Sequence, residues 1–164
     1  MIDGEKVSNF GKVENKGDYG ISAYSTKDAV NEKSGVISND GNTGFYIHNS
    51  YGANDGTISN NGNYGFTIDS KSQGINKGII ANKGRFGVAV YNNTFTNSPT
   101  GEIRNGSSYG LAIQNGGHGV NYGIIANKGN VGVSVSNSSS FVNHGTIEQD
   151  GKIAILMGNG DNTL

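Results

Sequence analysis

The acidic and histidine side chains are the residues of this chain that could carry out catalysis or hold a metal ion. There are 13 Asp and Glu residues, 3 His and no Cys, so disulfides, thiolate metal ligands and thiol nucleophiles are excluded. Cleavage of a glycosidic bond needs two carboxyl groups facing each other across it. The acids considered for this role have unrelated spacings: Asp18, Asp40, Asp55, Asp69, Glu102, Glu148 and Asp150. The histidines, His48, His118 and His144, are equally unrelated, so we expect no catalytic centre, no metal site and no cofactor.

Tyrosine is the other residue type whose chemistry suggests a function. The candidates for an interaction surface are Tyr24, Tyr46, Tyr51, Tyr91 and Tyr122. A tyrosine brings a large contact area at a small loss of conformational entropy, which is typical of recognition surfaces. Tyrosine also favours strands, so the fold alone could account for the same residues. Both interpretations stay open at the level of sequence.

An internal repeat sets the elements that must position these side chains. Each copy has an Asn, a Gly after a short spacer, an Ile or Val two residues later, and a second amide two residues after that. The seven copies start at Asn9, Asn31, Asn54, Asn76, Asn97, Asn121 and Asn143, a period of 21–24 residues. A period of this length, rich in Gly, Asn and β-branched residues, predicts an all-β fold, a parallel β-solenoid of seven coils.

Two features of the repeat predict which side chains fill the core. The aliphatic position is apolar in every copy: Val13, Ile37, Ile58, Ile80, Ile103, Ile125 and Ile147. Further along, an apolar triplet such as Phe45-Tyr46-Ile47 alternates with a period of two. This alternation predicts a short strand whose outer residues point inward and whose middle residue points outward. Coils stacked at the strand spacing would form a rod roughly 34 Å long.

The repeated amides form two columns, to which we assign a structural role. The first column contains Asn31, Asn54, Asn76, Asn97, Asn121 and Asn143, and the second contains Asn39, Asn60, Asn82, Asn105 and Asn127. Asn tolerates left-handed backbone angles and can bond its own backbone, which favours turns, and Gly tolerates the same angles because it lacks a Cβ. Amides stacked in register can also bond the amides above and below.

Between each triplet and the next Asn lies a segment that varies from copy to copy, and we expect it to be a loop. These segments include residues 24–29, 48–52 and 91–95, which contain Tyr24, Tyr51 and Tyr91. Tyr46 is instead the outward residue of a strand, and Tyr122 occupies an outward position of the repeat. Variable segments of repeat proteins often collect on the binding side. Two longer spacers, 32–34 and 98–100, should bulge at another corner.

Length and charge exclude several further function classes. A chain of 164 residues suits one domain, which we divide into a lead-in (1–6), a solenoid (7–157) and a tail (158–164). The net charge of −1 without a basic stripe argues against nucleic acid as a partner. No apolar run approaches the ~20 residues needed to insert into a membrane. The first six residues lack the apolar stretch of a signal peptide, so we expect a cytoplasmic protein or part of a longer exported chain.

The frame Asn-x-Gly-x-Ile-x-Asn-x-Gly-x-x-Gly-apolar-x-apolar, as in residues 76–90, resembles the passenger repeats of monomeric autotransporter adhesins. The resemblance covers about residues 7–157. These type V secreted proteins display a right-handed parallel β-helix on the outer membrane of diderm bacteria. The resemblance therefore implies a right-handed solenoid, which parallel crossovers also favour. It further implies an extracellular location on the bacterial cell surface and attachment to host cells or other bacteria.

Three functions remain open. The first is a non-catalytic structural and adhesive module that presents loops to an unidentified protein or glycan receptor on another cell. The second is an extracellular glycan-processing enzyme or tail-spike-like protein, which a groove with converging acids would distinguish. The third is a fibre subunit that associates end to end or laterally through uncapped strand edges.

Overall fold

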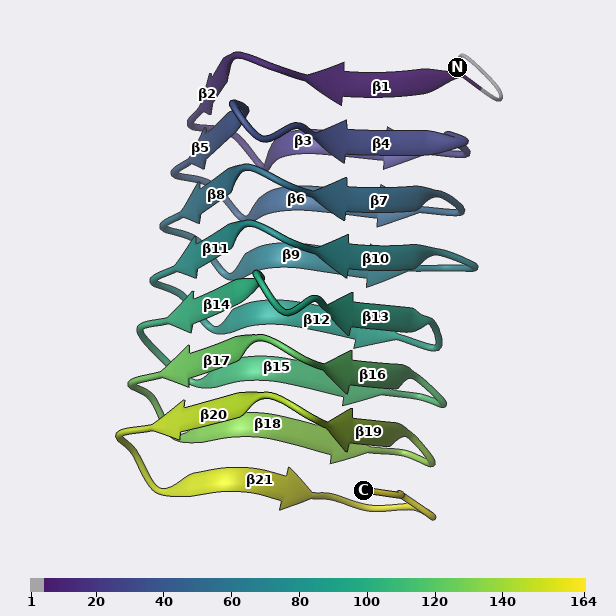
Figure 1. The fold of residues 1–164 in the computed structure, drawn as a ribbon, viewed down its shortest axis with the longest axis vertical. Helices are drawn as coiled ribbons and strands as arrows, with labels where there is room; N and C mark the ends of the chain where they lie inside the picture. Colours follow the sequence, from purple (N-terminus) through teal and green to yellow (C-terminus); the bar gives the residue numbers. More distant parts are fainter. Residues whose placement is uncertain (1–4) are drawn as a thin grey trace.

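The computed structural model describes residues 5–164, which form 21 β-strands and no helix. The coils stack on one another into a rod, with the N-terminal end at the top of Figure 1 and the C-terminal end at the bottom. The strands form three parallel sheets of seven strands each, which we name sheets A, B and C. The predicted parallel β-solenoid of seven coils is therefore confirmed.

Each sheet receives one strand from every coil. Sheet A consists of β1 (Lys6–Asn9), β4 (Asp28–Asn31), β7 (Tyr51–Asn54), β10 (Gln73–Asn76), β13 (Thr94–Asn97), β16 (His118–Asn121) and β19 (Ser140–Asn143). Sheet B consists of β2 (Lys12–Asn15), β5 (Val36–Asn39), β8 (Thr57–Asn60), β11 (Ile79–Asn82), β14 (Glu102–Asn105), β17 (Ile124–Asn127) and β20 (Thr146–Gln149). Sheet C consists of β3 (Tyr19–Tyr24), β6 (Thr43–His48), β9 (Tyr64–Asp69), β12 (Phe86–Tyr91), β15 (Tyr109–Gln114), β18 (Val131–Ser136) and β21 (Ile153–Met157).

The solenoid winds in a right-handed sense. In Figure 1 the chain runs to the left along sheet A at the front, turns through sheet B, and returns to the right along sheet C behind, while it descends. Neighbouring strands pair at corresponding positions of the repeat, for example Asn9 with Asn31 and Ile80 with Ile103. The repeat in the sequence is therefore also the hydrogen-bonding register of the sheets.

The core is thin and consists of stacked columns of apolar side chains. The five inner members of the aliphatic column are fully buried: Ile37, Ile58, Ile80, Ile103 and Ile125. Val13 and Ile147, at the two ends of the column, are half-buried. The inward residues of the triplets complete the core, and the rings of Phe45 and Phe66 stack with centroids 4.8 Å apart. The predicted aliphatic column is confirmed.

Sheet A begins inside the segments that the sequence predicts to be loops, and that prediction is wrong at both ends of each segment. The segment 91–95, for example, begins with the last residue of β12 and ends inside β13, which leaves residues 92–93 as the turn. The inward position of sheet A is often Gly, as in Gly52, Gly74 and Gly119, so the strand lacks the usual apolar alternation. A Cβ on Gly74 would press on the side chains of Ile68 and Phe95. The missing side chain makes room for its neighbours in the core.

Left-handed backbone angles occur mainly at the corner between sheets C and A. Among residues 5–164, the non-Gly residues with positive φ are Ser25, Asn49, Ser70, Lys71, Asn92, Asn115, Asn137 and Ser138. The left-handed turn role predicted for the two Asn columns is therefore wrong, because those residues end strands of sheets A and B. The repeated Gly residues are explained by the close approach of successive coils and not by left-handed backbone angles. A Cβ on Gly62 or Gly84 would overlap the backbone carbonyl group of the Gly one coil earlier.

Both Asn columns form hydrogen-bonded ladders that run along the rod. In the first column, from Asn9 to Asn143, each Nδ2 donates to the Oδ1 of the next coil at 2.8–2.9 Å. In the second column, from Asn15 to Asn127, the corresponding distances are 2.9–3.1 Å, and Gln149 accepts the last bond. The same amides donate to carbonyl groups of the corners, as Asn82 does to Phe86 at 2.8 Å. The ladders therefore hold neighbouring coils together and fix the corners of each coil.

The spacers and chain ends follow the path of the solenoid. The long spacers form an extra turn between sheets A and B, closed by bonds from Gly35 to Glu32 and from Gly101 to Ser98, both 2.7 Å (Figure 1). β21 ends at the predicted boundary, and the tail continues into a further coil in which Thr163 pairs in parallel with Ser140. β1 begins one residue before the predicted boundary, and residues 1–4 of the lead-in lie outside the described residues. Within 5–164, no helix has the length and apolar character needed to cross a membrane.

Candidate interaction surface on sheet C

Three of the five candidate tyrosines share the outer face of sheet C. Tyr46 lies within β6, and Tyr24 and Tyr91 are the last residues of β3 and β12. Tyr24 and Tyr91 are therefore strand residues and not loop residues, and so is Tyr51, the first residue of β7 in sheet A. Tyr122 lies at the corner between sheets A and B, where its ring stacks on His144 with centroids 5.0 Å apart. Tyr51 and Tyr122 are thus separate from the other three.

Four further aromatic residues, which the sequence interpretation missed, lie on the same outer face. They are the first residues of β3, β9, β12 and β15: Tyr19, Tyr64, Phe86 and Tyr109. Strict alternation would turn Tyr64 inward together with Phe66, but Tyr64 and Phe86 pack against the outward Ala89. Gly65, between Tyr64 and Phe66, is left out of the regular pairing with the next coil, so the alternation is interrupted there. The recurrence of aromatic residues at the first strand position was the available clue.

The aromatic rings form a packed layer over the middle of sheet C. Phe86 stacks between Tyr64 and Tyr109, with both centroid distances 5.1 Å, and the Arg85 guanidinium lies 4.8 Å from the Phe86 ring centre. Small outward residues beneath the rings, Ala89 and Ala112, are buried by them. The predicted outward direction of the middle triplet residues is therefore right, although the aromatic layer covers several of them. Burial raises the pKa of the Tyr91 phenol, and the neighbouring Tyr64 adds to this shift.

Nearer the N-terminal end, Tyr46 is the centre of a polar aromatic cluster. Its hydroxyl group donates to Asp69 Oδ2 at 2.9 Å and lies 3.4 Å from His48 Nδ1. Its ring lies 5.3 Å from that of Tyr19 and 5.5 Å from that of Tyr24. Burial raises the pKa of Tyr46, and the hydrogen bond to Asp69 raises it further. The phenol therefore stays protonated and acts as a donor to the carboxylate.

His48 and Asp69 are neighbours that the sequence interpretation treated as unrelated. They pair as the last residues of β6 and β9, and His48 Nδ1 lies 3.7 Å from Asp69 Oδ2. Both follow the apolar triplet directly, a position that the variable-segment assignment concealed. Tyr24, Tyr91, Gln114 and Ser136 occupy the same position in their own coils.

A cleft of about 450 Å³ lies between the aromatic layer and the Tyr46 cluster. Its lining includes Tyr19, Tyr46, Tyr64, Thr67, Asp69 and Tyr91. Thr67 is the outward middle residue of β9 and is 7% exposed. Its hydroxyl oxygen is buried and has no hydrogen-bond partner. The cleft therefore combines aromatic walls, one carboxylate and an unpaired hydroxyl group.

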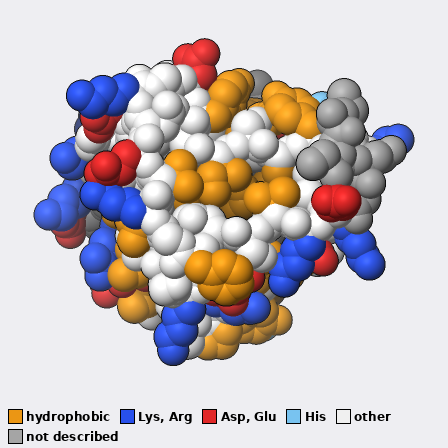
Figure 2. All heavy atoms as spheres, turned by 90° about the horizontal axis from the view of Figure 1, so that it is seen from above, with side chains coloured by type: hydrophobic (Ala, Val, Ile, Leu, Met, Phe, Trp, Pro, Cys, Tyr) orange, Lys and Arg blue, Asp and Glu red, His pale blue; other side chains and the backbone are white. Residues whose placement is uncertain are grey.

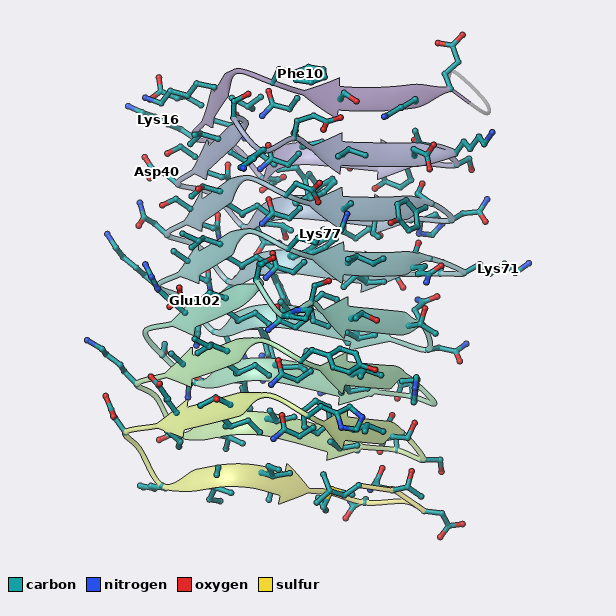
Figure 3. All side chains as sticks on the ribbon, viewed as in Figure 1. Phe10, Lys16, Asp40, Lys71, Lys77 and Glu102 are labelled. Carbon is teal, nitrogen blue, oxygen red and sulfur yellow. The ribbon has the colours of Figure 1, made fainter. Side chains whose placement is uncertain are left out.

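Charged side chains lie mainly away from sheet C. Figure 3 shows Lys16 and Asp40 at the corner between sheets B and C and Lys71 at the opposite corner. A hollow of about 470 Å³ on sheet B has an alanine floor, Ala81 and Ala126, and exposed charges of both signs around it. Two of these charged residues, Arg104 and Glu102, form an ion pair. Within residues 5–164 there is no group of three or more His, Asp or Glu side chains that could hold a metal ion.

No protein-family model matches this chain, and neither a curated protein nor a solved structure is significantly similar to it.

Proposed function

We propose that this chain is a non-catalytic structural and adhesive module that binds a receptor on another cell through the outer face of sheet C. The observation that carries the proposal is the gathering of seven aromatic residues on that face: Tyr19, Tyr24, Tyr46, Tyr64, Phe86, Tyr91 and Tyr109. Sheets A and B do not collect aromatic side chains in this way within the described residues.

Physical arguments favour recognition over a purely structural role for this face. The core is already complete on the inner side of sheet C, so the outer rings are not needed to fill it. Tyr19 and Tyr24 remain 40% and 47% exposed. Aromatic side chains held on a rigid sheet lose little conformational freedom on binding, so their contact area is converted efficiently into affinity. An extended rod also holds such a face away from the surface to which the rod is attached.

The resemblance to autotransporter passengers supports a location on the bacterial cell surface. On that basis the solenoid is displayed on the surface of a diderm bacterium as part of a longer exported chain, and its receptor is a protein or a glycan. Self-association, end to end or laterally, is compatible with this role, because neighbouring rods would present several copies of sheet C together.

A second candidate function, glycan cleavage, is favoured by one observation. Asp69, Tyr46 and His48 form a hydrogen-bonding cluster at the edge of a cleft. Hydrolysis needs a second carboxyl group within reach of the first. Among the described residues that line the cleft, Asp69 is the one carboxylate. We therefore rank the adhesive function above the enzymatic one.

Adhesion of the full chain, coupled to beads, to a panel of mammalian and bacterial cells tests the proposal. We expect beads carrying the wild-type chain to adhere to some of these cells, and beads carrying Tyr46→Ser/Tyr91→Ser to lose most of this adhesion. Tyr51→Ser on sheet A is the matched control and should adhere like the wild type. If the double variant folds poorly, Tyr24→Ser takes its place, because Tyr24 is an exposed residue on the same face. Absence of adhesion to every cell type, or equal loss with Tyr51→Ser, would contradict the proposal.

A further inference from the structure

We infer that the cleft above Thr67 on sheet C is a binding site for a neutral saccharide. This inference rests on the proposed adhesive function and names the class of receptor that sheet C recognises. It concerns one cleft, whereas the proposed function concerns the whole aromatic face, so the two can fail separately.

The buried hydroxyl group of Thr67 is the first reason to expect a polar ligand in the cleft. A buried hydroxyl without a hydrogen bond is costly, and most buried polar groups in proteins have a partner. Thr67 lies on the cleft lining, and its oxygen has no partner among the described residues. The oxygen itself is closed off from solvent, but rotation of the Thr67 side chain about its Cα–Cβ bond would turn the hydroxyl toward the cleft. A hydroxyl group of a ligand there would supply the missing bond.

The walls of the cleft suit a ring-shaped ligand with an apolar face. Tyr46 comes from the second coil and Tyr91 from the fourth, one coil on either side of Thr67. Their strands lie two strand spacings apart, roughly 9.6 Å, and Tyr91 is two residues further along its strand than Tyr46. The face of an aromatic ring is electron-rich, so it attracts the weakly positive C–H groups of a sugar ring. The walls therefore favour a flat carbohydrate ring over an extended chain.

The polar groups around the cleft favour a neutral ligand with many hydroxyl groups. Asp69 accepts a bond from Tyr46 at Oδ2 and one from the Ser70 N–H at Oδ1, and it has further lone pairs for ligand hydroxyl groups. The amides of Asn42 and Asn115 and the hydroxyl of Thr43 offer donors and acceptors at the rim. Asp69 is the one charged residue among the described lining residues, so an anionic ligand such as a phosphate or an acidic sugar is disfavoured.

A basic peptide is the main competing ligand, because a Lys or Arg side chain would pair with Asp69 and pack on the tyrosine rings. Such a side chain brings only donors to the cleft. The neutral amide and hydroxyl groups around the rim would then lack part of their pairing. The arrangement of several neutral polar groups around one carboxylate therefore favours a saccharide.

The test uses the full chain on an array of neutral and acidic saccharides together with Lys- and Arg-containing peptides, followed by calorimetric titration of the best ligand. We expect binding to neutral saccharides, with the affinity lowered about tenfold by Thr67→Val. Since the hydroxyl of Thr67 is unpaired, this substitution should leave the thermal stability of the unliganded chain unchanged or slightly raised. Asp69→Asn should also weaken binding, and Thr57→Val on sheet B, the matched control, should not.

Several outcomes would overturn the inference. They are binding to no saccharide, binding only to acidic saccharides or basic peptides, and saccharide binding that Thr67→Val leaves unchanged. If cell adhesion depends on Tyr46 and Tyr91 while no neutral saccharide binds, the proposed function stands and the inference fails. If a neutral saccharide binds in a Thr67-dependent way while no cell is bound, the cleft is correctly assigned and the adhesive role is wrong.

Discussion

The buried amides hold this solenoid together at the scale of single residues. Asn76 has no exposed surface, accepts a bond from Asn54 at 2.9 Å and donates one to Asn97 at 2.8 Å. A buried amide that loses its partner keeps the full desolvation penalty. Each rung of the ladder is therefore stable only while its neighbours in the adjacent coils are present.

Replacement of Asn76 by alanine should lower the free energy of unfolding by about 3 kcal/mol, because it leaves one N–H of Asn54 and the Oδ1 of Asn97 buried without a partner. Asn63→Ala is the matched control, since Asn63 donates to Asn42 in an exposed amide pair. We expect the control to change stability by less than about 0.5 kcal/mol. Denaturant unfolding of both variants measures the difference, and equal midpoints would show that the ladder contributes little.

The two shifted phenols predict how stability changes at alkaline pH. The pKa values of Tyr46 and Tyr91 are raised in the folded state. Between the unfolded pKa of about 10 and the higher folded pKa, the unfolded state has lost the proton that the folded state still holds. The stabilisation is therefore complete below about pH 10 and is lost as the pH rises further.

Ultraviolet titration of the phenols should show two tyrosines that ionise later than a free phenol, and Tyr46→Phe and Tyr91→Phe should each remove one of them. Each variant should also lose less stability than the wild type between neutral and alkaline pH. If both variants still contain two tyrosines that ionise later than a free phenol, the raised pKa values do not belong to Tyr46 and Tyr91.

At the scale of the element, the corner between sheets B and C depends on close contact between successive coils. A Cβ on Gly84 would overlap the carbonyl group of Gly62, whereas a Cβ on Gly106 would meet its nearest atom, the Lys83 Cα, at 3.6 Å. The two glycines lie at the same corner of neighbouring coils. Alanine substitutions at the two positions therefore distinguish the effect of a clash between coils from the effect of a less flexible unfolded chain.

We expect Gly84→Ala to destabilise the fold by about 1–3 kcal/mol, because the backbone of the adjacent coil must move. Gly106→Ala should leave stability unchanged or raise it by up to about 1 kcal/mol, since it restricts the unfolded chain without a clash. Thermal unfolding of the two variants provides the comparison. A Gly84→Ala variant as stable as Gly106→Ala would show that the corners can separate.

Sheets B and C were predictable from sequence because their inward positions are aliphatic in almost every coil, as Ile58 and Ile80 illustrate. Sheet A was not predictable in the same way, since Gly52 and Gly74 fill its inward position and carry no apolar signature. At the candidate site, Tyr46 followed from alternation, but Tyr64 did not, because the irregular pairing at Gly65 changes the direction of the preceding residue. The contact of His48 with Asp69 depends on the register between coils, which the assignment of both to variable segments concealed.

At the scale of the whole molecule, the ends of the rod expose apolar side chains. Figure 2 views the N-terminal end along the rod and shows apolar side chains in its middle. Val7 and Phe10 are 46% and 66% exposed, and Phe10 lies at the top of the rod in Figure 3. Ile153 and Met157, in the last strand, are each 38% exposed. Within residues 5–164, β1, β2 and β3 have no strand above them, and β20 and β21 have none below, so these edges could pair with another copy.

The isolated chain of 164 residues should therefore associate in a concentration-dependent way, and head-to-tail contacts of this kind do not close, so they can extend into filaments. Sedimentation velocity over a wide concentration range measures this. Phe10→Ser should weaken the association, whereas Lys71→Ser, on an exposed turn, should not. A strictly monomeric species at the highest soluble concentration would contradict the prediction.

Oxidative footprinting of the chain bound to cells tests our proposal that sheet C is the binding face of the rod. The tyrosines report on separate faces: Tyr24, Tyr46 and Tyr91 on sheet C, Tyr51 on sheet A, and Tyr122 at the corner between sheets A and B. We expect binding to protect the three sheet C tyrosines from oxidation and to leave Tyr51 and Tyr122 as reactive as in the free chain. Protection of Tyr51 or Tyr122 without protection of sheet C would contradict this proposal.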